Sequence, residues 1–255
     1  KFLTQTQDME RVSVIEGKQK AGEALSREDL RFLYEIDRKI EGFGYGKSPR
    51  VEKLLKDRDK RADFALVFKC HPTQISFTQD EFLKNRTLYH FGDLILNEAK
   101  TPNELPPLPR YMKGTLSLGG LQDARGLILP AGVKWVILNG LKSAEGLILP
   151  AGVEWVYLDG LKTVRGLILP AGVKRVDLDG LQDARGLILP AGVTSVGLTG
   201  LQTVRGLKLP EGIREIQIRG KFFDIRDPQS LQKIQKKIDR GALDVGWTSF
   251  LLNLF

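Results

Sequence analysis

Residues 121–220 consist of five consecutive blocks of 20 residues that share one pattern. They read LQDARGLILPAGVKWVILNG (121–140), LKSAEGLILPAGVEWVYLDG (141–160), LKTVRGLILPAGVKRVDLDG (161–180), LQDARGLILPAGVTSVGLTG (181–200) and LQTVRGLKLPEGIREIQIRG (201–220). A repeat of fixed length in this range is typical of a solenoid, in which each block forms one coil and stacks on the next. Weaker copies precede the blocks at 93–96 and 115–120. We therefore expect seven coils.

Each block contains one short stretch in which buried and outward positions alternate. Val136 and Leu138 alternate with Trp135, Ile137 and Asn139, which is the period-two pattern of a strand with one buried face. A single coil buries too little apolar surface to be stable alone. The equivalent strands of successive coils are therefore expected to pair into a parallel sheet.

The rest of the block predicts how the coil turns. Leu127 and Leu129 indicate a second short segment that faces the core and ends at Pro130, which lacks the N–H that a strand ladder needs. Asn139-Gly140 predicts the turn after the strand, because Gly tolerates a positive φ and Asn can bond its own backbone. Asp-Gly occupies the same place in the next two blocks.

The pattern V-x-x-V-x-L-x-x-L followed by L-x-L-P spans Val153 to Leu161 and then Leu167 to Pro170. It resembles the short bacterial leucine-rich repeats of secreted effectors and surface proteins, and the resemblance covers residues 94–220. It implies a leucine-rich-repeat-like parallel β-sheet stack that serves as a protein-binding scaffold. That family usually closes its turn with Asn or Cys, whereas this chain has leucine at 121, 141, 161, 181 and 201. We therefore expect no Asn ladder, and a flat β-solenoid is the alternative.

The residues before the repeats predict an N-terminal helical domain or cap over 1–92, followed by the 20-residue-repeat solenoid over 93–220. Ser26 with Asp29 predicts a capping box that opens a helix closed by Gly42. Ser48 before Pro49 predicts a second helix, and Thr78 with Glu81 a short third one. Covering the exposed edge of the first coil is the expected role of this region.

The residues after the repeats predict a C-terminal cap over 221–255. Asp227 is a suitable N-cap before Pro228, and Gly241 a suitable C-cap. Between them lies an apolar stripe of Leu231, Ile234 and Ile238. The apolar residues of 250–255 are expected to pack back on the last coil.

Composition argues against several kinds of site. Cys70 is the one cysteine of the chain, so neither an internal disulfide nor a Cys-rich metal cluster can form, and we expect no metal and no cofactor. Cys70 is followed by His71, but neighbours in a helix or strand point apart, so we expect no enzyme. No apolar run approaches the about 20 residues of a membrane span. The compartment is left open.

The net charge of +8 is spread along the chain. Basic residues exceed acidic ones by two in 1–100, by two in 101–200 and by four in 201–255. The single basic cluster has helical spacing and no interleaved aromatic residues that could stack on bases: Lys233, Lys236, Lys237 and Arg240. Nucleic acid is therefore not the expected partner.

The outward positions of the strand vary from block to block, whereas GLILPAGV barely changes. Down the stack they read Trp135, Trp155, Arg175, Ser195 and Glu215; then Ile137, Tyr157, Asp177, Gly197 and Gln217; then Asn139, Asp159, Asp179, Thr199 and Arg219. Neighbouring exposed aromatic side chains usually mark an interaction site. We predict a non-enzymatic scaffold that binds a protein or peptide through Trp135, Ile137, Trp155, Tyr157, Asp159, Arg175, Asp177 and Asp179. From Ser195 onward, drift at solvated positions is the favoured interpretation.

The aspartates allow an alternative function. Asp159 and Asp179 should stack about 4.8 Å apart, with Asp177 on the same face, and separations of this order occur between the carboxyl groups of glycoside hydrolases. The alternative is a carbohydrate-binding β-solenoid that uses the Trp, Tyr and Asp side chains, with polysaccharide cleavage less favoured. The competing interpretation is that Asp before Gly only shapes the turn, as Asn139 does.

An invariant residue lies between the two leucines of the L-x-L-P segment. If Leu127 and Leu129 face the core, an outward apolar ladder follows, made of Ile128, Ile148, Ile168 and Ile188 and interrupted by Lys208. We expect the coil to twist so that these isoleucines are partly buried; the alternative is a homodimer seam. The expected state is a monomer or a weak homodimer.

Overall fold

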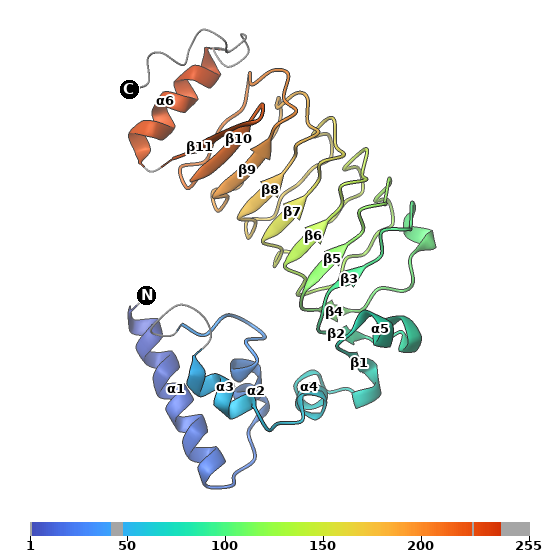
Figure 1. Ribbon diagram of the computed structural model, residues 1–255, viewed down its shortest axis with the longest axis vertical. Helices are drawn as coiled ribbons and strands as arrows, with labels where there is room; N and C mark the ends of the chain where they lie inside the picture. The colour runs from blue at the N-terminus through green and yellow to red at the C-terminus, as the bar shows by residue number, and fades with distance from the viewer. Residues whose placement is uncertain (1, 42–47, 226, 241–255) are drawn as a thin grey trace. The chain divides into compact units, whose positions relative to one another are not determined.

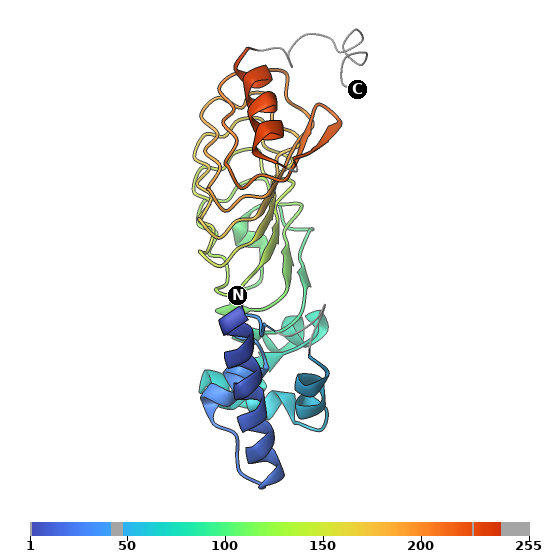
Figure 2. The ribbon, with the colours of Figure 1, turned by 90° about the vertical axis from the view of Figure 1, so that its left-hand side faces the viewer.

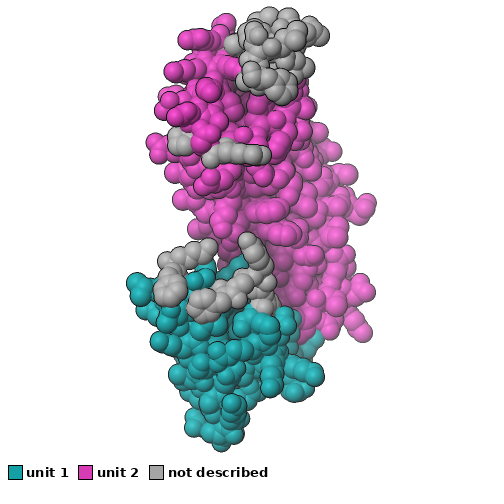
Figure 3. Space-filling view, turned by 60° about the vertical axis from the view of Figure 1, so that its left-hand side comes forward, with its two compact units in different colours: residues 1–75 teal, residues 76–255 magenta. Residues whose placement is uncertain are grey.

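The computed structural model describes residues 2–41, 48–225 and 227–240. The chain forms two compact units, residues 1–75 and residues 76–255, which are coloured separately in Figure 3. The second unit begins before the expected solenoid boundary at residue 93. None of the helices within these described ranges is long and apolar enough to cross a lipid bilayer.

The first unit is helical and has its own core. Its elements are α1 (Phe2–Lys20), α2 (Arg27–Leu33), α3 (Pro49–Leu55), α4 (Lys60–Phe68) and the 3₁₀ turn η1 (Pro72–Gln74). Val12 and Ile15 of α1 are fully buried among the apolar side chains of α2, α3 and α4. The helices α1 and α4 were not predicted, because α1 is largely polar and α4 begins at a capping aspartate, Asp59, inside a charged stretch.

The expected capping box of α2 is confirmed, but the length of the helix is not. Ser26 accepts a hydrogen bond from the Asp29 N–H, and the Asp29 carboxylate accepts one from the Ser26 N–H. The helix ends at Leu33 because the next turn adopts other geometry, with Glu35 in the left-handed region at φ +52°. The expected end at Gly42 lies outside the described residues.

The second unit contains the expected repeat, a parallel-strand β-solenoid of about six turns (Figure 1). Its parallel strands are β3 (Leu94–Ile95), β5 (Thr115–Ser117), β6 (Trp135–Ile137), β7 (Trp155–Tyr157), β8 (Arg175–Asp177), β9 (Ser195–Leu198) and β10 (Glu215–Ile218). From β5 to β10, each strand residue pairs with the residue 20 positions later. The strands lie along one side of the stack and the connecting segments along the other (Figure 2).

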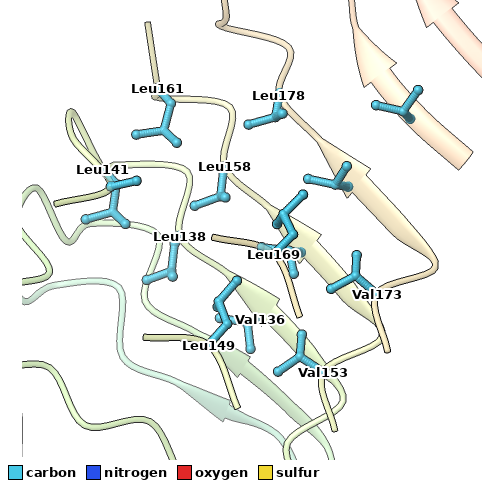
Figure 4. Close-up of a cluster of buried hydrophobic side chains, with 14 of the residues drawn as sticks. Val136, Leu138, Leu141, Leu149, Val153, Leu158, Leu161, Leu169, Val173 and Leu178 are labelled. Atoms are coloured by element: carbon cyan, nitrogen blue, oxygen red, sulfur yellow. The ribbon is translucent and has the colours of Figure 1, made fainter. Parts of the chain in front are cut away.

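The core of the solenoid is a stack of identical apolar layers. The coil that contains β6 buries seven side chains: Val133, Val136, Leu138, Leu141, Ala144, Leu147 and Leu149. Their equivalents from neighbouring coils lie directly above and below them (Figure 4). Three corners, each closed by a hydrogen bond between residues three apart, bring the chain around: Leu141 to Leu138, Leu147 to Ala144 and Val153 to Pro150.

The glycine that ends each of the first four blocks is required by the close approach of consecutive coils. A Cβ at Gly140, Gly160, Gly180 or Gly200 would collide with a carbonyl oxygen of the preceding coil. The expectation that these glycines provide a positive φ is wrong. Positive φ, between +78° and +83°, occurs instead at the glycine in the sixth position of each block, directly after Arg or Glu, as in Gly146 and Gly166 and their equivalents.

The first coil is covered by residues that directly precede it. The helix α5 (Gln79–Asn85) begins at the predicted cap Thr78, which accepts a hydrogen bond from the Glu81 N–H. Phe82 of this helix is fully buried in the same core cluster as the coils. Near it lies a three-stranded sheet in the order β1 (Ile75–Ser76), β2 (Tyr89–His90), β4 (Tyr111–Met112), and the 3₁₀ turn η2 (Pro102–Glu104) follows β3.

The other end of the stack is closed by a hairpin and the predicted helix. Arg219 and Gly220 both have positive φ, as a two-residue hairpin turn requires, and the chain returns as the antiparallel strand β11 (Lys221–Asp224). Helix α6 (Pro228–Asp239) begins at Asp227, as expected, and buries Ile238 in the core. The Gln235 side chain bonds the backbone of Leu207 and Leu209. The expected cap at Gly241 and the packing of 250–255 lie outside the described residues.

The close approach of coils gives a direct test. We expect Gly180→Ala to destabilise the solenoid by about 1–3 kcal/mol or more, because the new methyl group must push the Asp159 carbonyl away. Gly152→Ala is the matched control, since the nearest atom to its Cβ is the end of the Lys134 side chain at 3.9 Å. Chemical denaturation followed by circular dichroism measures both. Equal stability of the two variants would contradict this account of the coil spacing.

Candidate functional site

The predicted site residues lie on three neighbouring strands and the turns after them. In-register pairing places Trp135, Trp155 and Arg175 in one outward column of β6, β7 and β8. A second column contains Ile137, Tyr157 and Asp177. All eight predicted residues therefore belong to one continuous strip across the same coils, in which residues 20 apart in the sequence become neighbours.

The two tryptophans form a stack along the axis of the solenoid. Their ring centroids are 4.9 Å apart and their planes differ by 18°, which matches the spacing of about 4.8 Å between paired strands. Trp135 is 45% exposed, and Trp155 is half-buried. One face of each indole therefore lies against the other indole.

The third outward position, at the turn after the strand, forms an Asn/Asp ladder. Asn139 accepts a hydrogen bond from the Asp159 N–H at 3.4 Å, Asp159 from the Asp179 N–H at 3.2 Å, and Asp179 from the Thr199 N–H at 3.0 Å. At the start of the stack, Asn97 accepts one from the Gly119 N–H at 2.7 Å. The expectation that the chain has no such ladder is wrong.

That expectation came from the column of leucines at 121–201, which are fully or almost fully buried and make no side-chain hydrogen bonds. The ladder lies two positions earlier in the block, at the residue before the glycine. The sequence signal for it was the recurrence of Asn or Asp at this position, which had been interpreted as turn chemistry within one coil. The side chains instead bond the backbone of the next coil.

Asp177 is the most unusual group of the strip. It is only 7% exposed, and its Oδ2 accepts two hydrogen bonds from the Arg175 guanidinium, each 3.1 Å long. Its Oδ1 is buried without a hydrogen-bond partner among the described residues. A Cβ at Gly197 would lie 2.7 Å from this atom and 2.9 Å from Oδ1 of Asp179. The two carboxylates therefore converge beside Gly197.

Two carboxylates of the strip, those of Asp159 and Asp177, resist ionisation. Burial raises the pKa of Asp177, against the opposing effect of Arg175, and the charges of Asp179 and Asp159 raise it further. Burial also raises the pKa of Asp159, against the opposing hydrogen bond from the Asp179 N–H, and the charge of the Asp179 carboxylate raises it further. The in-register stack thus brings like charges together, and their repulsion lowers the stability of the fold at neutral pH.

The opposite end of the strands carries the complementary charge. Glu154, just before β7, lies between Lys134 at 3.0 Å and Lys174 at 3.2 Å. Burial alone would raise the pKa of Glu154, but hydrogen bonds from these two lysines hold this pKa below its usual value. Across β6–β8 the surface therefore runs from lysines before the strands to aspartates after them.

Catalytic chemistry finds little support elsewhere in the described ranges. Burial raises the pKa of the Cys70 thiol, which opposes thiolate formation, and His71 bonds Thr73 instead. Oγ of Ser76 lies 2.8 Å from Nδ1 of His90, a contact that no sequence pattern predicts, but both residues are fully buried. No cluster of His, Cys, Asp or Glu among the described residues is arranged to hold a metal ion.

The isoleucine ladder behaves differently from the favoured expectation. Ile128, Ile148, Ile168 and Ile188 are between 76% and 84% exposed, while the leucines on either side of each are buried or nearly so. The coil does not twist enough to cover them, so the expectation of partial burial within the chain is wrong. A second apolar surface is left on the solenoid.

No protein-family model matches this chain, and no curated protein or solved structure shows significant similarity to it. The function must therefore be argued from the site itself.

The raised pKa of Asp159 gives a pH-dependent prediction. Asp159→Asn keeps the oxygen that accepts the Asp179 N–H and copies Asn139, but it removes a carboxylate whose pKa is raised on folding. A raised folded-state pKa means that the ionised group lowers stability above that pKa, and that this cost disappears below the unfolded value of about 3.9. We expect a melting temperature higher by up to about a few degrees at neutral pH, with the gain shrinking as pH falls.

Asp183→Asn is the control in which the pKa shift has the opposite direction, because a hydrogen bond from Arg185 lowers the pKa of Asp183. This pair is on the surface, so the control should lose little stability at neutral pH. Thermal melts of both variants between pH 4 and 8, followed by circular dichroism, measure the difference. A gain for Asp159→Asn that is independent of pH would contradict the electrostatic explanation.

Proposed function

We propose that the chain is a non-enzymatic recognition scaffold that binds a protein or peptide segment across β6–β8. The binding surface is the aromatic–acidic patch, defined as Trp135, Ile137, Trp155, Tyr157, Asp159, Arg175, Asp177 and Asp179. The observation that carries the proposal is the exposed Trp135–Trp155 stack, built on a scaffold whose inward positions hardly change from coil to coil. Large aromatic side chains that remain at a surface are the residues that most often dominate protein interfaces.

The charges of the patch favour a basic segment as the ligand. Three aspartates converge at its end, and Arg175 is already bonded to one of them. Asp159 and Asp179 each use Oδ1 for the ladder, which leaves the second oxygen of each for another donor. A lysine or arginine of the ligand would relieve the repulsion among the carboxylates while its aliphatic stem packs against Tyr157 and Trp155.

Carbohydrate binding remains the second candidate, supported by the proximity of aromatic and carboxylate groups. The stack geometry favours it less, because sugars pack on the faces of aromatic rings and one face of each indole is occupied by the other indole. Catalytic use of the aspartates is also less favoured, since Asp159 and Asp179 serve as backbone acceptors and Asp177 is buried.

We also propose the relationship to bacterial leucine-rich repeats. It is supported by the V-x-x-V-x-L and L-x-L-P spacing and by side-chain oxygens that bond the next coil after the strand, as Asn97 and Asn139 do.

The proposal predicts binding to arrayed peptides. We expect the protein to bind a subset of Lys- and Arg-containing peptides that also carry apolar residues, and to lose at least about tenfold in affinity in Trp135→Ala/Trp155→Ala/Tyr157→Ala. Because the carboxylates contribute through partly exposed charges, binding should weaken as salt is raised. A glycan array probed in parallel tests the second candidate.

The matched control is Ser195→Ala/Gln217→Ala, which truncates outward side chains of β9 and β10 outside the patch. It should bind like the wild type. If the triple variant keeps its fold by circular dichroism and still binds the same peptides, the assigned surface is wrong. Glycan binding that is lost in the triple variant would replace the peptide proposal with the carbohydrate one.

A further inference from the structure

The isoleucine ladder forms a raised apolar ridge on the solenoid. Ile128, Ile148, Ile168 and Ile188 project from the same position of four successive coils and are 84%, 76%, 78% and 81% exposed. Small exposed residues lie close to each isoleucine in the sequence, as with Gly126 and Ala131 in the first block. Isolated exposed apolar residues are ordinary, but a continuous row of four reaches the upper end of what a monomer leaves in water.

A column of charged side chains borders this ridge. The residue three positions before each isoleucine is Arg125, Glu145, Arg165, Arg185 or, before Lys208, Arg205. Beside Ile168 a shallow depression of about 700 Å³ is lined by Arg165, Asp183 and Arg185, which places charge directly next to the apolar row. Glu145 is the one acidic member of the column and lies 3.0 Å from Arg165 of the same chain.

We propose that this ridge is the seam of a symmetric homodimer, in which a second copy of the chain packs ridge to ridge with its stack antiparallel. The twofold axis passes between the coils of Ile148 and Ile168. This register pairs Ile128 with Ile188 and Ile148 with Ile168 of the second copy. It is the one antiparallel register that matches all four isoleucines, because a shift by a coil in either direction leaves one of them without an isoleucine opposite.

The charged column also favours a second copy of the chain as the partner, with its stack antiparallel. In the antiparallel arrangement the column of one copy faces the column of the other, so Glu145 lies opposite Arg165 of the second copy at the centre of the seam. The outer arginines, Arg125 and Arg185, are each already bonded to an aspartate of their own coil. A parallel arrangement would instead place Glu145 opposite the small residues on the far flank of the ridge.

The apolar surface area of the ridge is also suitable for self-association. A stable interface buries about 800 Å² per partner. Four largely exposed isoleucines contribute several hundred Å² of apolar surface, and the small residues that flank them let two such ridges approach closely. Lys208 occupies the ladder position of the next coil and ends the row of isoleucines.

The test is the solution mass of the full chain. Sedimentation equilibrium or light scattering should show a dimer at concentrations up to about 0.1 mM. Ile148→Lys/Ile168→Lys should raise the dimer dissociation constant at least tenfold. The control Gln182→Lys/Gln202→Lys adds the same charge at exposed positions where Lys142 and Lys162 already stand in neighbouring coils, and it should remain a dimer. A monomeric wild type, or a dimer that survives the isoleucine variant, would overturn the seam.

A charge exchange tests the register and does not depend on the isoleucine variant folding. Glu145→Arg should weaken the dimer, because two like charges then meet at the centre, and Glu145→Arg/Arg165→Glu should restore it. The pair within one chain is exposed and contributes little to folding. Failure of the double exchange to restore the dimer would overturn the antiparallel register. The variant Trp135→Ala/Trp155→Ala/Tyr157→Ala should remain dimeric. Its dissociation into monomers would show that the dimer interface lies on the sheet instead.

Discussion

The spacing between successive coils is the constraint on which the rest of the structure depends. Parallel strand pairing sets it at about 4.8 Å, and the glycine that ends each of the first four blocks makes it possible, since a Cβ at Gly140 or Gly180 would collide with the previous coil. At this spacing the buried leucines and valines form continuous columns, and the side chains of Asn139 and Asp159 reach the backbone of the next coil. The packed core and the Asn/Asp ladder therefore both follow from the spacing between successive coils.

The same spacing creates the proposed site and its electrostatic cost. Trp135 and Trp155 stack because their coils are one strand apart, and Asp177 and Asp159 meet other carboxylates for the same reason. An aromatic column is stabilised by repetition, whereas an acidic column is destabilised by it. Stability does not require carboxylates at consecutive coils, since Asn139 shows that an amide can fill the ladder position without charge, and the proposed cationic ligand would account for them.

Periodicity made the strands, the outward columns and the buried faces predictable, because a 20-residue repeat with period-two alternation permits few other folds. The Asn/Asp ladder was missed because its position was taken from a resemblance to another repeat family, although the recurring residue before glycine marked it. Exposure of Ile148 and its equivalents could not be judged from sequence, since it depends on how far the coil twists after Leu147. Helix α1 gave little signal because only a few of its residues, such as Val12 and Ile15, are buried.

The two surfaces of the solenoid differ in a way that bears on their partners. The combination of residues that faces outward from the sheet differs at every coil, so the proposed ligand would fit in only one register there. The isoleucine ridge is identical in four coils, and a uniform ridge is complementary to another copy of itself. Uniformity alone would allow two copies to slide. Glu145, the one acidic residue in a column of arginines, and Lys208, the break in the ladder, remove that freedom by making one register better than its neighbours.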